Sequence, residues 1–144
     1  MKVFIGADHR GFSLKEHLKS FISSLGYTVE DCGARLLNSE DDYPDFAHTV
    51  SKKVLENQAS RGILICGSGA GISMAANRFK GIRAVLAINK DQVKDSVSDE
   101  DANVLSLSAD YISESDAKDI VETFLSAQFA NDERFVRRIN KLDV

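Results

Sequence analysis

The amino-acid sequence predicts an α/β protein, a three-layer αβα sandwich in which helices cover both faces of a five-stranded parallel sheet. Two observations lead to this prediction. Short apolar runs of strand length alternate with stretches whose apolar residues recur at helical spacing, and this alternation continues along all 144 residues. Five strands that alternate with helices are also typical of a parallel sheet covered on both faces.

The first strand is expected over residues 2–7, KVFIGA, and a helix should follow because the next apolar residues recur three and four positions apart. These residues are Leu14, Leu18, Phe21, Ile22 and Leu25. Gly26 suits the end of this helix, since glycine readily takes the left-handed backbone conformation common there. YTVEDC, residues 27–32, is the second expected strand.

A polar loop over residues 36–47 leads to the second helix, with Pro44 expected in its first turn. The buried face of this helix is predicted to be Phe46, Val50, Val54 and Leu55. GILIC, residues 62–66, is the third strand, and a helix is expected over residues 70–78.

RAVLAI, residues 83–88, predicts the fourth strand, and a helix is expected over residues 90–98. NVLSLS, residues 103–108, is the fifth strand. Ser113 suits the N-cap of a further helix. The apolar face of that helix is predicted to be Ala117, Ile120, Val121, Phe124 and Leu125. A basic tail over residues 133–141 closes the chain.

Composition excludes several classes of function. The length and the 43% hydrophobic content fit one domain over residues 1–144. The net charge of −4, from 18 basic and 22 acidic residues spread along the chain, argues against a nucleic-acid partner. No apolar run could span a bilayer and no signal-peptide pattern is present, so we expect a cytoplasmic protein without a membrane partner. Two separated cysteines suggest free thiols, with neither a disulfide framework nor a metal site.

Candidate chemical groups gather at one edge of the predicted sheet. In Rossmann-like sheets ligands bind at the carboxyl ends of the strands, where Asp8 and His9 end the first strand and Cys66 ends the third. The glycine-rich turn GSGAG follows Cys66, and the amide groups and dipole of the next helix favour a thiolate there. A thiolate can act as nucleophile or general base, although Cys66 at this stage can also be interpreted as a small buried residue at a strand end.

The other candidates have similar alternatives. Asp8 could cap the following helix instead of acting in catalysis. Arg134 and Arg138, four positions apart, could grip a phosphate or simply form a solvated basic face. Cys32 is interpreted as a packing residue. GSGAG lacks the lysine of a P-loop and lies in the third strand–helix unit, so it does not indicate a nucleotide site.

Five segments together resemble ribose-5-phosphate isomerase B, a family that also contains the galactose-6-phosphate isomerase subunits. They are GADHRGFSLK, DYPDFA, GILICGSGAGISMAANRFKGIRA, DANVLSLSADYI and ERFVRRI, in order over nearly the whole chain. The resemblance implies an aldose–ketose isomerase that acts through a cis-enediolate without metal or cofactor, with Cys66 as the proton-transferring base. It makes Ser68 a hydroxyl proton relay. Ala75 stands where some relatives place a glutamate base.

The resemblance also implies the substrate contacts. The matching residues are Asp8, His9, Tyr43, Gly67, Ser68, Gly69, Ala70, Gly71, Arg134 and Arg138. In this family the two arginines reach the site from a neighbouring subunit, which implies a homodimer or tetramer with shared sites. The basic tail would be the segment that reaches across.

One departure from the family leaves the substrate open. Asp99 and Glu100 occupy the places of a His-Asn pair whose histidine helps to open the sugar ring, and Asp110 replaces a common arginine. A carboxylate is a poor proton donor at neutral pH. Because Cys66, Ser68, the glycine turn and both arginines are present, we expect a ribose 5-phosphate isomerase, with Asp99 as a candidate catalytic group and Glu100 as a candidate substrate contact. A hexose-6-phosphate isomerase of the galactose or allose type and a non-catalytic phosphosugar-binding protein remain alternatives.

Overall fold

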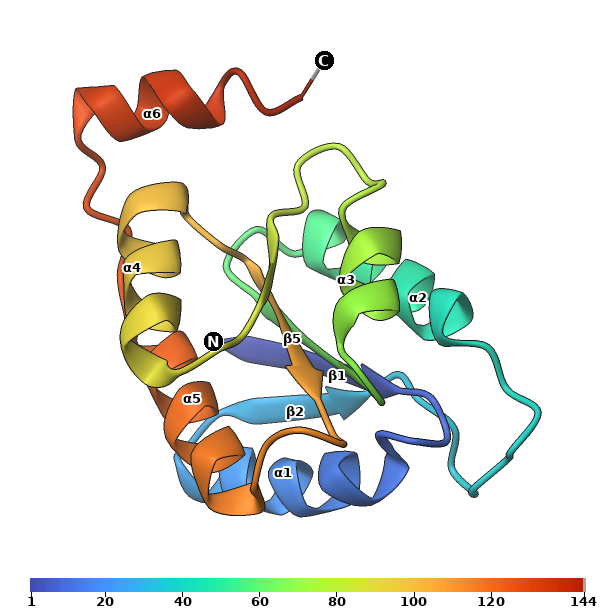
Figure 1. The fold of residues 1–144 in the computed structure, drawn as a ribbon. Coiled ribbons are helices and arrows are strands. Elements are labelled where there is room, and N and C mark those ends of the chain that lie inside the picture. Colours follow the sequence, from blue (N-terminus) through green and yellow to red (C-terminus); the bar gives the residue numbers. More distant parts are fainter. Residues whose placement is uncertain (144) are drawn as a thin grey trace.

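The computed structural model describes residues 1–143 and confirms the predicted α/β sandwich (Figure 1). Five strands alternate with six helices. They are β1 (Lys2–Ala7), α1 (Phe12–Ser24), β2 (Thr28–Asp31), α2 (Tyr43–Glu56), β3 (Arg61–Cys66), α3 (Ala70–Ala76), β4 (Ala84–Leu86), α4 (Lys90–Glu100), β5 (Val104–Ser108), α5 (Glu114–Ser126) and α6 (Glu133–Ile139).

The sheet is parallel throughout, with the strand order β2-β1-β3-β5-β4. β5 therefore lies between β3 and β4, although it follows both in the sequence. The registers place Ala7 beside Ile65 and Cys66 beside Ser108. The carboxyl ends of β1, β3 and β5 are consequently neighbours, and we call this side of the sheet the carboxyl edge.

Alternate residues of the strands pack in two different hydrophobic cores. In β3, Ile63 and Ile65 pack in the core shared with α1, α4 and α5, whereas Leu64 and Cys66 pack in the core shared with α2 and α3. Figure 1 shows these two sets of helices on opposite sides of the sheet. Both faces of the central strands are covered, which explains why β1 and β3 are continuous apolar runs.

Two predicted details are wrong. Leu55 is 41% exposed, because the buried stripe of α2 instead follows positions three and four apart. That stripe is Ala47, Val50, Ser51 and Val54. β4 is only three residues long, because it is an edge strand whose pairing with β5 ends at Leu86. α4 extends to Glu100 and ends where Asp101 takes a left-handed conformation, with φ of 50°.

A buried lysine fastens α1 to the end of β2. The Lys15 side chain is fully buried, and its Nζ lies 2.6 Å from Asp31 Oδ2 and 2.9 Å from Glu16 Oε1. It also donates a 3.3 Å hydrogen bond to the Ala34 carbonyl. A buried ammonium group needs such partners. This anchor fixes the start of the loop that runs from β2 to α2 past the carboxyl edge.

The C-terminal helix α6 lies beyond the opposite side of the sheet, where the strands begin and which we call the amino edge. The Ala130 amide donates a 2.9 Å hydrogen bond to the Ser98 carbonyl near the end of α4. After α6, Asp143 accepts a 3.2 Å hydrogen bond from the Gly81 amide, just before β4. Figure 1 shows α6 next to the end of α4 and apart from the sheet.

Candidate active site

The carboxyl edge brings together Asp8, His9 and Cys66, as the sequence predicted. Asp8 and His9 follow β1 directly, and Cys66 is the last residue of the neighbouring β3. The Asp8 amide donates a 3.2 Å hydrogen bond to the Ile65 carbonyl, which holds the two strand ends together. Asp8 and Cys66 are buried, with 5% and 4% of their surfaces exposed.

The Asp8 carboxylate shapes the turn before α1. Its Oδ1 accepts hydrogen bonds from the backbone amides of Arg10 at 3.0 Å and Gly11 at 3.1 Å. This geometry is that of an Asx turn, in which an aspartate satisfies amides that precede a helix. Asp8 Oδ1 therefore stabilises the turn, as the structural interpretation expected, but it does not cap α1, whose N-cap is Gly11 and which has no side-chain cap.

An aspartate that the sequence analysis missed orients His9. Asp41 Oδ1 accepts hydrogen bonds from the His9 amide at 2.9 Å and from His9 Nδ1 at 2.8 Å. Because a carboxylate only accepts, Nδ1 carries the proton, and Nε2 is left for a ligand. The hydrogen bond with Asp41 raises the pKa of His9 above its ordinary 6.5, against the opposing effect of desolvation. The acidic run SEDD, residues 39–42 in the loop between β2 and α2, was the sequence signal that could have indicated a carboxylate partner for His9.

The turn after Cys66 depends on its glycines. Gly69 has φ of +73°, and a Cβ there would lie 3.0 Å from the Leu107 carbonyl carbon. At Gly71 a Cβ would lie 2.7 Å from Tyr43 Cζ, so the Tyr43 ring closes over the first turn of α3. Ser68 is exposed, and its hydroxyl oxygen lies 3.3 Å from the Ala70 amide. Tyr43 and all five turn residues thus join the predicted site.

A second missed feature is an ion pair between Arg10 and Asp110. Arg10 follows His9, and Asp110 lies just beyond β5, so the pair bridges two loops of the carboxyl edge. It lies directly over Gly67, where a Cβ would be 2.6 Å from Arg10 Nε and 2.8 Å from Asp110 Oδ2. Oppositely charged residues 100 positions apart carry no local sequence signal.

The remaining predicted residues lie elsewhere in this chain. Asp99 and Glu100 form the last turn of α4, which begins near the carboxyl edge and ends at the amino edge. Arg134 and Arg138 are exposed on α6, which is anchored at the amino edge by its flanking segments. One chain therefore does not bring these four side chains to Cys66.

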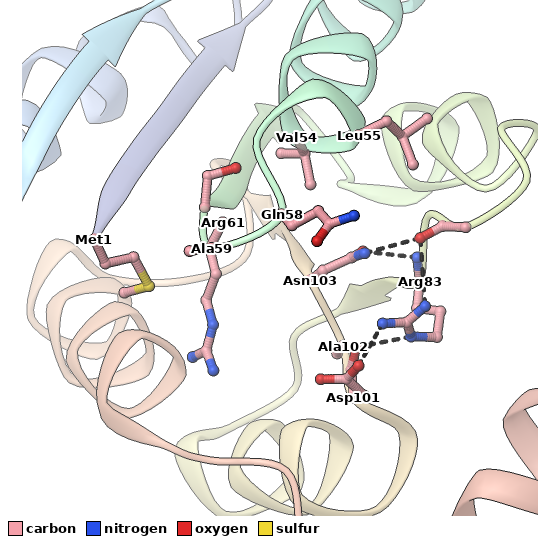
Figure 2. A pocket seen from close by; sticks show the side chains of 12 residues that line it. Met1, Val54, Leu55, Gln58, Ala59, Arg61, Arg83, Asp101, Ala102 and Asn103 are labelled. Carbon is pink, nitrogen blue, oxygen red and sulfur yellow. Dashed lines mark hydrogen bonds and ion pairs between the residues drawn. The ribbon is translucent and has the colours of Figure 1, made fainter.

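A hollow of about 420 Å³ at the amino edge is not this site (Figure 2). It is lined by segments that precede β3, β4 and β5. Its polar groups bind one another: Arg83 pairs with Asp101 at 2.7 Å, and Asn103 accepts from the Arg83 amide at 2.8 Å and donates to the Gly81 carbonyl at 2.8 Å. These contacts fix the turns that lead into β4 and β5.

Among residues 1–143, no three His, Cys, Asp or Glu side chains cluster closely enough to hold a metal ion. Within the same residues no helix has the length and apolar character that crossing a membrane requires.

Comparison with known proteins identifies the family. Residues 3–142 match the family model described as Ribose/Galactose Isomerase. The chain belongs to this family. A probable ribose-5-phosphate isomerase B of Mycoplasma genitalium is 39% identical over 141 residues, which cover 97% of this chain and 92% of the relative. Ribose-5-phosphate isomerase B of Escherichia coli is 38% identical over 128 residues, covering 89% and 85%.

Solved structures of the ribose/galactose isomerase family have the same fold. The Mycoplasma genitalium ribose-5-phosphate isomerase B, solved with bound ribulose 5-phosphate, superposes with a TM-score of 0.93 at 39% identity, covering 98% of this chain and 93% of that one. The Thermotoga maritima ribose 5-phosphate isomerase gives a TM-score of 0.94 at 44% identity, covering 99% and 97%. The resemblance to ribose-5-phosphate isomerase B is confirmed.

Proposed function

We propose that this protein interconverts ribose 5-phosphate and ribulose 5-phosphate, with Cys66 as the base. The observation that carries this proposal is the position of Cys66 at the end of β3, beside Asp8, His9 and the glycine turn. Family membership and the similar Mycoplasma genitalium structure with bound ribulose 5-phosphate support the substrate.

In the proposed reaction the Cys66 thiolate removes the proton from C2 of the open-chain aldose, which gives a cis-enediolate. The same proton returns to C1, while the exposed hydroxyl of Ser68 passes a proton from the C2 oxygen to the C1 oxygen. The amides of residues 67–71 stabilise the negative charge on the enediolate oxygens. One proton moves from C2 to C1 and another from the C2 oxygen to the C1 oxygen, so the isomerisation needs no external reductant.

We further propose that a second copy of the chain completes each site, in a homodimer or tetramer. Asp99, Glu100, Arg134 and Arg138 are distant from Cys66 in one chain, so a neighbour would have to supply them. The free edge of β4 suits such a contact. A hollow of about 690 Å³ along it is lined by residues that include Leu86, Glu100 and Leu142.

The free edge of β4 also adjoins the glycine turn. A Cβ on Gly69 would lie 2.5 Å from Leu86 Cδ1, so a chain docked on this edge would reach the turn. The edge carries exposed apolar side chains that association would bury. These are Met74, Leu86, Ile88 and Leu142, with 37% to 73% of their surfaces exposed.

A hexose-6-phosphate substrate is the second candidate, because Asp99 and Glu100 stand where the resemblance to the ribose-phosphate enzymes implies a His-Asn pair. A non-catalytic phosphosugar-binding protein is disfavoured by the retained Cys66. As an isomerase with a free cysteine base, the protein would work in the cytoplasm, where thiols stay reduced.

A coupled isomerase assay with ribose, allose and galactose phosphates tests the function. Ribose 5-phosphate should give the highest kcat/KM, and Cys66→Ala should lower kcat at least ~10²-fold, the usual effect of removing a general base. Cys32→Ala is the matched control. Cys32 is half-buried, and burial raises the pKa of its thiol to about 11, with Glu30 adding to the effect. Turnover by Cys66→Ala close to that of Cys32→Ala would overturn the proposed role.

A further inference from the structure

The Arg10–Asp110 pair lies beside the proposed base at the carboxyl edge. Its charged groups lie over Gly67, the residue that follows the proposed base, and it connects the loops after β1 and β5. The proposed function assigns no role to the side chain of Arg10 or to that of Asp110.

Backbone contacts hold the pair's two loops. The Arg10 amide donates to Asp8 Oδ1 at 3.0 Å, and the Asp110 amide donates to the Gly67 carbonyl at 3.1 Å. The side chains themselves face outward, with 58% of Arg10 and 34% of Asp110 exposed. Exposed ion pairs contribute little free energy, so this pair opens at low cost.

Within one chain, the carboxyl edge offers few positive charges to a phosphorylated ligand. Asp8, Asp41 and Asp110 are acidic, while His9 and Arg10 are the basic groups of the cluster described above. A phosphate monoester carries a charge of about −1.5 to −2 at pH 7. The planar guanidinium group binds two phosphate oxygens at once, which an imidazole does not.

We propose that Arg10 binds the phosphate group of the substrate from the same chain as Cys66, and that Asp110 is the partner of Arg10 only while the site is empty. The identity of the phosphorylated substrate rests on the proposed function. On binding, the guanidinium group exchanges the Asp110 carboxylate for phosphate oxygens. Arg10 is then a substrate-binding residue and Asp110 an internal competitor.

The two residues should have opposite effects on phosphate affinity. Arg10→Ala should raise the Kd for inorganic phosphate about tenfold, because it removes a charge-assisted contact at a partly exposed site. Arg10→Lys, which keeps the charge but loses the planar fork, should give a smaller rise. Asp110→Asn should lower the Kd about two- to fivefold, since it removes the competing charge. The double variant should match Arg10→Ala.

Calorimetric titration of inorganic phosphate into each folded variant tests these expectations. Arg78→Ala is the control, because Arg78 is an exposed arginine in the turn after α3, near the amino edge. In the active enzyme, Arg10→Ala should raise KM with kcat changed less than about twofold, the signature of lost ground-state binding.

The proposal is overturned if Arg10→Ala binds phosphate as tightly as Arg78→Ala, or if it lowers kcat without changing the phosphate Kd. Weaker binding by Asp110→Asn would overturn the role of Asp110 as competitor. The titration needs no turnover. If the protein has no isomerase activity but its phosphate affinity still depends on Arg10, the proposed function is contradicted and this inference is supported. If the protein is an active isomerase whose phosphate affinity does not depend on Arg10, the proposed function is supported and this inference is contradicted.

Discussion

Mixing two inactive variants should restore about a quarter of the wild-type isomerase activity. The variants are Cys66→Ala, which lacks the proposed base, and Arg134→Ala, which lacks a proposed phosphate ligand. Cys66 ends β3 at the carboxyl edge, whereas Arg134 lies on α6, whose flanking segments are fixed at the amino edge. If both residues serve one site, they come from two chains.

The expected recovery follows from counting sites in a dimer. Random exchange in an equal mixture makes about half of the dimers hybrids, and in a hybrid one site has lost both residues while the other has kept both. About one site in four is then intact in the whole mixture. Neither parent variant has any such site.

The assay requires subunits that have exchanged. Co-expression with two different affinity tags or joint refolding would produce hybrids, native mass spectrometry would verify them, and a coupled isomerase assay would measure turnover. The control mixes Cys66→Ala with the double variant Cys66→Ala/Arg134→Ala, in which no hybrid site has a base. Verified hybrids without recovered activity would refute the reasoning, as would an Arg134→Ala variant with wild-type kcat/KM.

Three further predictions follow from individual contacts. We expect the imidazolium form of His9, one of the implied substrate contacts, to bind the phosphate. Because Asp41 raises the pKa of His9, this binding should persist above pH 6.5 and fade as pH rises through the raised pKa. In Asp41→Asn the rise of KM with pH should begin at lower pH, and an unchanged KM profile would contradict this role. Asp99→His combined with Glu100→Asn should raise kcat/KM for ribose 5-phosphate more than for the acyclic ribulose 5-phosphate if ring opening limits turnover, and equal changes would show that it does not. Asp31→Ala should reduce the free energy of unfolding by about 3 kcal/mol in urea titration, since it leaves the buried ammonium group of α1 with poorer partners, and a loss below about 1 kcal/mol would contradict that account.

The sequence predicted the order and type of the elements because local patterns determine them. Short β-rich runs identified all five strands, and Gly26, with φ of +91°, ends its helix as expected. The strand order is a different matter. Nothing in the sequence of β4 or β5 says that β5 pairs with β3 and pushes β4 to the edge, because this choice depends on how whole layers pack.

The site was predictable where residues are neighbours in sequence or follow adjacent strands. Cys66 and His9 were found in that way. Asp41 and the Arg10–Asp110 pair were missed, because their partners are brought together only by loop paths between distant elements. The exposure of Leu55 could not be read from its apolar character, since its neighbour Val54 already fills the buried position.

The place of β4 in the sheet has a consequence for how the chain folds. β4 pairs only with β5, which is made later, so during synthesis the segment Ala84–Leu86 has no strand to dock on until residue 108 has emerged. β1, β2 and β3 can pair before that point. Because β4 is a three-residue strand held by β5 alone, we also expect its amides to be among the first to open to hydrogen exchange in the native state.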